Sequence, residues 1–109
     1  MKTYITIKTQ FEAIHCWPEC PIEAVSFLRN EHRHLFIVKC KAPVYHDDRD
    51  REFIHCKHEI EDFVREQYDR RNLGRKSCEM LCKEIQKAFP FLSYVRVEED
   101  GENGAELIV

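Results

Sequence analysis

The chain has 109 residues, of which 43% are hydrophobic and 34% are charged, and its formal net charge at pH 7 is −3. This composition indicates one folded globular domain over residues 1–109 and excludes a disordered chain. No apolar run approaches the roughly 20 residues that cross a bilayer, and the first residues lack the apolar core of a signal peptide, so we expect a cytoplasmic protein with no membrane partner. Basic residues are scattered among acidic ones, which argues against nucleic-acid binding.

Six cysteines in a chain of this length would suggest disulfides in a secreted protein, but the reducing cytosol makes free thiols the expectation. Two pairs are closely spaced, Cys16 with Cys20 and Cys78 with Cys82, and neither is accompanied by a second pair at zinc-ribbon spacing. We interpret Cys40, Cys78 and Cys82 as small buried hydrophobic residues. Cys16 and Cys20 follow a histidine and stay candidate metal ligands or nucleophiles.

Two extended segments are predicted in the first half of the chain. Apolar and polar residues alternate over residues 4–15, which predicts a long strand whose apolar row ends at His15. A second strand is expected over residues 32–41. Because side chains in a strand alternate between its two faces, His32 and His34 point to the same side.

If these two strands pair, His15 can join His32 and His34 at one spot. Three neutral imidazoles with an open fourth position form the ligand set of a catalytic rather than a structural zinc. The alternative interpretation is three ordinary strand histidines that are solvated or hydrogen-bonded.

The remaining elements are predicted from residues that interrupt the strand pattern and from changes in the spacing of apolar residues. Residues 18–30 contain two prolines and predict a loop that carries a helical turn. After a turn over residues 45–50, apolar positions recur at three- and four-residue steps and predict a helix over residues 52–68. Ser77 is placed as the N-cap of a second helix, which ends before Pro90.

Two final strands are predicted over residues 94–99 and 105–109, and the glycine-containing segment 100–104 between them suits a hairpin turn. The order is strand, strand, helix, helix, strand, strand. We therefore predict an α+β fold in which a four-stranded antiparallel sheet packs on two helices.

Four short motifs lie in order along these elements: Phe11-Glu-Ala-Ile-His15, His32-Arg-His34, Lys76-Ser-Cys-Glu79 and Val95-Arg-Val-Glu-Glu99. They resemble, in turn, the Phe-x-Ala-x-His, His-Gly-His, Pro-Thr-Ser-Glu and Val-x-Val-x-Glu-Thr motifs of the 6-pyruvoyl-tetrahydropterin synthase and 6-carboxytetrahydropterin synthase family. This family has the tunnelling fold, or T-fold. The resemblance covers nearly the whole chain. The run Phe27-Leu-Arg-Asn-Glu-His-Arg-His34, with Ser77-Cys-Glu-Met80, resembles a compact, phage-type branch of the family.

The resemblance implies which residues form the site. The three histidines would hold zinc, and Glu99 would anchor the ring of a pterin, with Glu98 one register slip away. A carboxylate suits this role because its two oxygens match two adjacent N–H donors. Ser77 would contact the same ligand. Where this sequence departs from the family, basic residues would favour a phosphorylated or carboxylated ligand if several of them line the pocket, and otherwise they are surface charges: Arg33, Arg70, Arg71, Arg75 and Lys76.

The departures from the family concern its proton-moving groups. Family lyases use a cysteine shortly before His-Gly-His, whereas the nearest upstream cysteine here is Cys20, with Cys16 behind it. Their Asp-His pair after the first helix corresponds to Asp69 and Arg70, and arginine is a poor general base. His55 is a candidate substitute for the missing imidazole.

Two functions of different classes are therefore predicted. One is a zinc-dependent lyase or hydrolase that acts on a pterin- or purine-type substrate, with Cys20, His55 and Asp69 as candidate catalytic residues. The other is a non-catalytic binder, viral or regulatory, that sequesters a purine nucleotide or related small molecule. A structural module with zinc as a staple is the weakest alternative, because three ligands leave the metal open.

Assembly is also implied by the resemblance. Tunnelling-fold subunits form barrels from several chains, commonly trimers stacked into hexamers, with ligand pockets between subunits. A short chain with exposed sheet edges has a physical reason to do the same, because closure removes unpaired edges. We expect a homo-oligomer.

Overall fold

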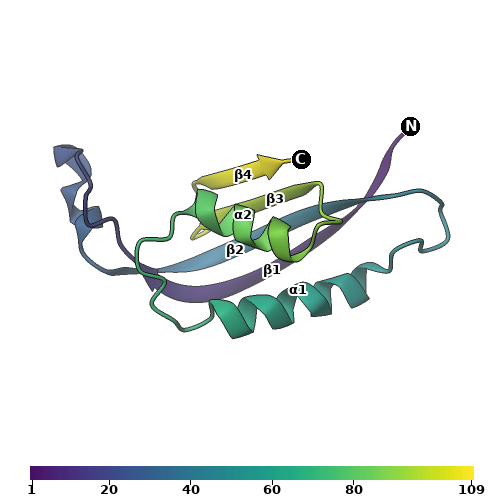
Figure 1. Ribbon diagram of the computed structural model, residues 1–109, viewed down its shortest axis with the longest axis horizontal. Coiled ribbons are helices and arrows are strands. Elements are labelled where there is room, and N and C mark those ends of the chain that lie inside the picture. The colour runs from purple at the N-terminus through teal and green to yellow at the C-terminus, as the bar shows by residue number, and fades with distance from the viewer.

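Four antiparallel strands in the order β1-β2-β3-β4 form one sheet, and two α-helices lie on one of its faces (Figure 1). The computed structural model describes all 109 residues. The elements are β1 (Thr3–His15), the 3-10 helix η1 (Glu23–Arg29), β2 (His32–Val44), α1 (Phe53–Gln67), α2 (Cys78–Ala88), β3 (Tyr94–Glu99) and β4 (Gly104–Ile108). The predicted order and the α+β class are confirmed.

The core lies between the helices and the covered face of the sheet. Helix α1 contacts β1, and α2 contacts β3 and β4. Alternate residues of the strands point into this layer, as the period-two pattern predicts. The largest fully buried side chains include Phe11, Phe36, Tyr68, Leu81 and Ile85. The histidines close the same inward-facing rows, so the metal-ligand candidates lie at one end of the core.

Strand β2 continues to Val44, three residues beyond the predicted end at Lys41. Pro43 lies within this extension and pairs with Tyr4 of β1. Proline has no amide hydrogen to donate, so it is disfavoured where a strand has neighbours on both sides. The pairing of β2 with β3 ends at Lys41 opposite Tyr94, so Pro43 has only one neighbouring strand.

A side chain caps the N-terminus of each α-helix. Ser77 accepts a hydrogen bond from the Met80 amide at 3.2 Å, which confirms it as the N-cap of α2. Glu52 accepts from the amides of Ile54 and His55 at 3.0 Å and caps α1 in the same way. Residues 18–30 carry the predicted helical turn as η1.

The segment after α1 runs along the outer edge of β1. The amide of Ile14 donates to the Arg71 carbonyl at 3.0 Å, and the amide of Leu73 donates to the Ile14 carbonyl at 2.7 Å. The amide of Cys16 then donates to the Gly74 carbonyl at 2.9 Å. These bonds hold the backbone of residues 71–76 beside the end of β1, where His15 lies.

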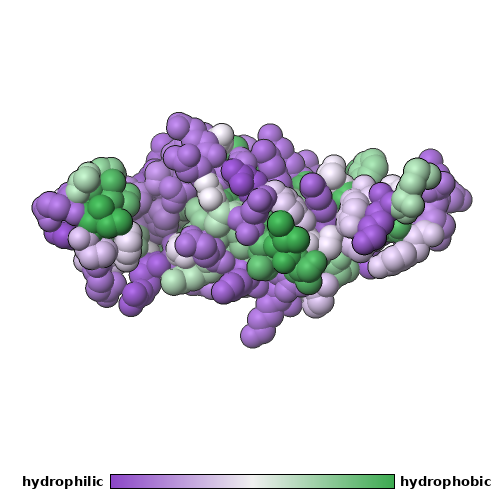
Figure 2. Space-filling view, turned by 90° about the horizontal axis from the view of Figure 1, so that it is seen from above, coloured by the Kyte–Doolittle hydropathy of each residue, from purple (hydrophilic) through white to green (hydrophobic).

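The outer surface is mostly hydrophilic, and its apolar areas are separate (Figure 2). One apolar area lies at the end of the molecule that carries η1, where Ile22 and Phe27 are exposed. None of the helices has the length and apolar composition that a membrane-spanning segment requires. On the sheet face away from the helices, the Glu98 carboxylate is buried and pairs with Arg96 at 2.5 Å and Lys39 at 3.2 Å.

Replacement of Phe36 by alanine tests the core. The Phe36 side chain is fully buried and stacks on Phe11 with ring centroids 5.0 Å apart. We expect Phe36→Ala to lower the free energy of unfolding by about 3–5 kcal/mol, measured by urea denaturation. The control Phe27→Ala removes an exposed ring and should change it by less than about 0.5 kcal/mol. Equal losses in the two variants would contradict this placement of the core.

Replacement of Glu98 by glutamine tests the buried ion pair. Arg96 chiefly, with help from Lys39 and against the effect of burial, lowers the pKa of Glu98 below its ordinary value of 4.5. Such a group stabilises the fold above that ordinary value, and its contribution is lost as pH falls through the lowered folded pKa. The stability difference between wild type and Glu98→Gln should therefore shrink as pH falls below about 4.5. A difference that stays constant with pH in urea titrations would contradict the ion pair.

Candidate metal centre

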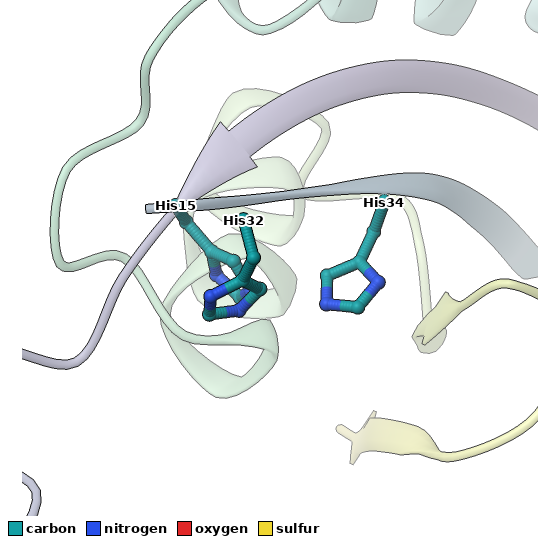
Figure 3. A group of neighbouring side chains, drawn as sticks. All are labelled: His15, His32 and His34. Carbon is teal, nitrogen blue, oxygen red and sulfur yellow. The ribbon is translucent and has the colours of Figure 1, made fainter. Parts of the chain in front are cut away.

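Strand pairing places three histidines on one face of the sheet. In the antiparallel register of β1 and β2, His15 lies directly opposite His32, and His34 lies opposite Ala13. The three rings point to the same side and come together at the ends of the two strands (Figure 3). One nitrogen from each ring lies within 4.8 Å of the others, so the group could hold a metal ion. The convergence that alternation and pairing predicted is present.

A hydrogen-bond acceptor fixes the orientation of each imidazole through its Nδ1 atom. The acceptors are the Lys76 carbonyl for His15 at 2.9 Å, the Asn30 carbonyl for His32 at 2.8 Å, and the Asp100 carboxylate for His34 at 2.6 Å. A carbonyl oxygen can only accept, so Nδ1 carries a hydrogen, and in the neutral imidazole Nε2 keeps its lone pair. Metal-binding histidines show this arrangement, because the outer acceptor selects the tautomer and aims the free nitrogen.

The Nε2 atom of His15 is buried and makes no hydrogen bond. Buried polar atoms without a partner are rare in native proteins and call for an explanation such as an ion. Glu99 Oε2 lies 3.0 Å from this atom, and the two groups form an ion pair when His15 is protonated. Burial lowers the pKa of His15, but the Glu99 carboxylate and the Lys76 carbonyl together raise it more strongly, so the net direction is upward. In return, His15 chiefly lowers the pKa of Glu99.

A cavity of about 500 Å³ adjoins the histidines. His15, His32 and Glu99 form one side, and the first turn of α2 forms another. Trp17, Ser77 and Cys78 are also among the residues that line it. Its volume is within the range of about 300–1,000 Å³ that is typical of small-molecule pockets.

Two of the predicted ligand contacts lie at this cavity, and two candidate catalytic residues do not. Glu99 and Ser77 line it. The Cys20 side chain is buried under η1, where its Sγ donates to the carbonyls of residues 22 and 25 at 3.7 and 3.8 Å. His55 lies exposed in the first turn of α1, with Nε2 at 3.2 Å from Glu59. Within one protomer neither Cys20 nor His55 reaches the cavity.

The other three predicted residues gather around Glu12 on β1. Arg33 points to the opposite sheet face from the neighbouring histidines, and its guanidinium lies 2.5 Å from the Glu12 carboxylate. Asp69 accepts from the Glu12 amide at 3.0 Å, and the Arg70 amide donates to the Glu12 carbonyl at 2.6 Å. Arg33, Asp69 and Arg70 therefore form a second polar group, separate from the cavity of the same protomer.

Sequence reasoning missed several groups that shape the site. Asp100 binds His34 through Oδ2 and the Leu35 amide through Oδ1 at 3.0 Å. The position of Asp100 directly after Glu99 and before a glycine turn was the only sequence signal for its role. The carbonyls of residues 30 and 76 had no signal, because any residue supplies a carbonyl. Cys78 was interpreted as a core residue and is buried, but it also lines the cavity, and burial raises its pKa to about 12.

The fold is shared with a solved enzyme structure. The chain is similar to 6-pyruvoyl tetrahydropterin synthase of Caenorhabditis elegans, with a TM-score of 0.76 and 17% sequence identity over 100% of this chain and 96% of that chain. No protein-family model and no curated protein matches the sequence. The chain therefore has the tunnelling fold, and the resemblance in its motifs is confirmed at the level of the fold.

Replacement of Asp100 by asparagine tests the orientation of His34. The amide side chain would still offer an oxygen to the Leu35 amide, but the charged acceptor on His34 Nδ1 would be lost. We expect Asp100→Asn to weaken zinc binding about 10- to 100-fold, measured by competition with a chromophoric chelator. The control Asp47→Asn changes an exposed loop carboxylate and should bind zinc as the wild type does. Unchanged affinity in Asp100→Asn would contradict an orienting role.

Proposed function

We propose that the chain binds one zinc ion through His15, His32 and His34 and holds a pterin- or purine-type small molecule in the adjoining cavity. The observation that carries this proposal is the set of three Nδ1 acceptors, which leaves three Nε2 lone pairs pointing to one place. The Nε2 of His15 also supports it, because this atom is buried and makes no hydrogen bond.

The donor set favours zinc or another transition metal over magnesium and calcium. Imidazole nitrogen suits zinc, whereas magnesium and calcium prefer oxygen ligands. Three protein ligands leave room for a further one, as in catalytic sites. When bound, zinc supplies Lewis-acid polarisation of a ligand oxygen.

The cavity has the groups that a flat nitrogenous ring requires. The Glu99 side chain is 31% exposed at its edge and can accept from two adjacent N–H groups of such a ring. Trp17 offers an aromatic wall, and the backbone amides at the start of α2 offer donors. This chemistry supports a pterin or a purine and excludes a purely apolar ligand.

Two kinds of activity remain consistent with this site. The fold favours a lyase of the 6-carboxytetrahydropterin synthase type, in which case Cys16 or Cys78, which line the cavity, are better placed than Cys20 to move a proton. A second function is non-catalytic capture of a purine nucleotide. It is favoured by the position of Cys20, His55 and Asp69 outside the cavity of the same protomer.

We also propose that the chain assembles into a homo-oligomer, either a trimer or a hexamer. Strands β1 and β4 are the two edges of the sheet, and each leaves backbone groups without a neighbouring strand. Edge pairing between copies would satisfy these groups.

One experiment separates the proposed activities. Protein expressed without added metal is analysed for metal content and for released small molecules, and is then incubated with dihydroneopterin triphosphate. We expect about one zinc per chain in the wild type. Conversion of the pterin supports the lyase, whereas release of an unchanged purine nucleotide supports the binder.

The matched variants make this test specific. His32→Ala should bind zinc more weakly and retain less of it than the wild type, because one of the three imidazole ligands is lost. His58→Ala removes an exposed histidine of α1 and should keep it. Equal zinc in His32→Ala and wild type would contradict the proposed centre.

A further inference from the structure

The Glu99 carboxylate lies within the histidine group and not only at the edge of the cavity. In the β2 and β3 register Glu99 lies opposite Phe36, so its side chain is on the face that carries His34. Its Oε2 is 3.0 Å from Nε2 of His15, and its Oε1 is 3.6 Å from Nε2 of His34. Each carboxylate oxygen therefore faces a different imidazole.

These contacts join atoms that repel each other in the absence of a positive charge. The hydrogens of His15 and His34 are on Nδ1, where the Lys76 carbonyl and the Asp100 carboxylate accept them. When the imidazoles are neutral, each Nε2 then presents a lone pair to an ionised carboxylate, and a proton or a metal ion must lie between them. A cation that binds all of these atoms removes the repulsion, because every one of them is an electron-pair donor.

The distances also fit a shared ion. Two ligand atoms that are each 2.0–2.1 Å from a tetrahedral zinc lie about 3.3 Å apart. The two nitrogen-to-oxygen distances, 3.0 and 3.6 Å, lie on either side of this value. The Cys78 thiol donates to Glu99 Oε2 at 3.8 Å and steadies the carboxylate from the core side.

We propose that Glu99 is the fourth ligand of the metal when the cavity holds no small molecule. This inference rests on the proposed three-histidine centre and adds a protein carboxylate to it. A molecule that takes this fourth position from the cavity displaces Glu99. The displaced carboxylate is then free to bind N–H groups of that molecule. Release of Glu99 from the metal and binding of the ring are therefore coupled.

The test uses cobalt(II) as a visible probe of the metal and azide as a small ligand that needs an open position. Wild type, Glu99→Gln and Glu102→Gln are loaded with cobalt and titrated with azide, and the absorption bands of cobalt are followed. Glu102 is an exposed carboxylate in the turn after β3, so Glu102→Gln is the matched control. Azide should bind Glu99→Gln at a concentration at least about tenfold lower than the other two proteins, and cobalt affinity should fall about tenfold or more.

The outcomes distinguish this inference from the function on which it rests. Equal azide midpoints and equal cobalt affinities in the three proteins would overturn Glu99 as a ligand while leaving the histidine centre intact. Absence of cobalt binding by the wild type would overturn both. Glu99→Ala provides a second variant if glutamine disturbs the fold, and it should open the metal to azide in the same way.

Discussion

The pairing of His15 with His32 is the constraint on which the site depends. A shift of one residue between β1 and β2 would turn the histidines of one strand to the opposite face of the sheet. The long apolar row that ends at His15 fixes this register, because Phe11 and Phe36 stack within the same pairing. The core therefore positions the three candidate ligands, because the strand contacts that stabilise the fold also bring the histidines together.

Strand pairing alone does not fix the orientation of an imidazole ring. Hydrogen bonds from other parts of the chain fix it. The loop after α1 brings the Lys76 carbonyl to His15 by bonding along the edge of β1, and the turn after β3 brings Asp100 to His34. Glu99 reaches the same group because β3 is the next strand of the sheet. Elements from the whole length of the chain thus converge at one end of the sheet, beside the cavity.

The sequence predicted the elements well because their signals are local. Alternation marked β1, the Ser77 cap marked the start of α2, and the glycine turn separated the last two strands. The contacts of Arg33 with Glu12 and of His34 with Asp100 join residues far apart in the chain. Spacing within a motif therefore predicted the common face of the histidines but not the outer hydrogen bonds of the candidate metal site.

The source of the outer hydrogen bonds has a consequence for how the chain can evolve. Two of the three Nδ1 acceptors belong to the main chain, at positions 30 and 76, so mutations there can change the side chain without removing the acceptor. Only position 100 contributes through its side chain. Substitutions at these two loop positions therefore leave the hydrogen bonds to His15 and His32 in place. Related chains can diverge far in sequence and still keep these two orienting contacts.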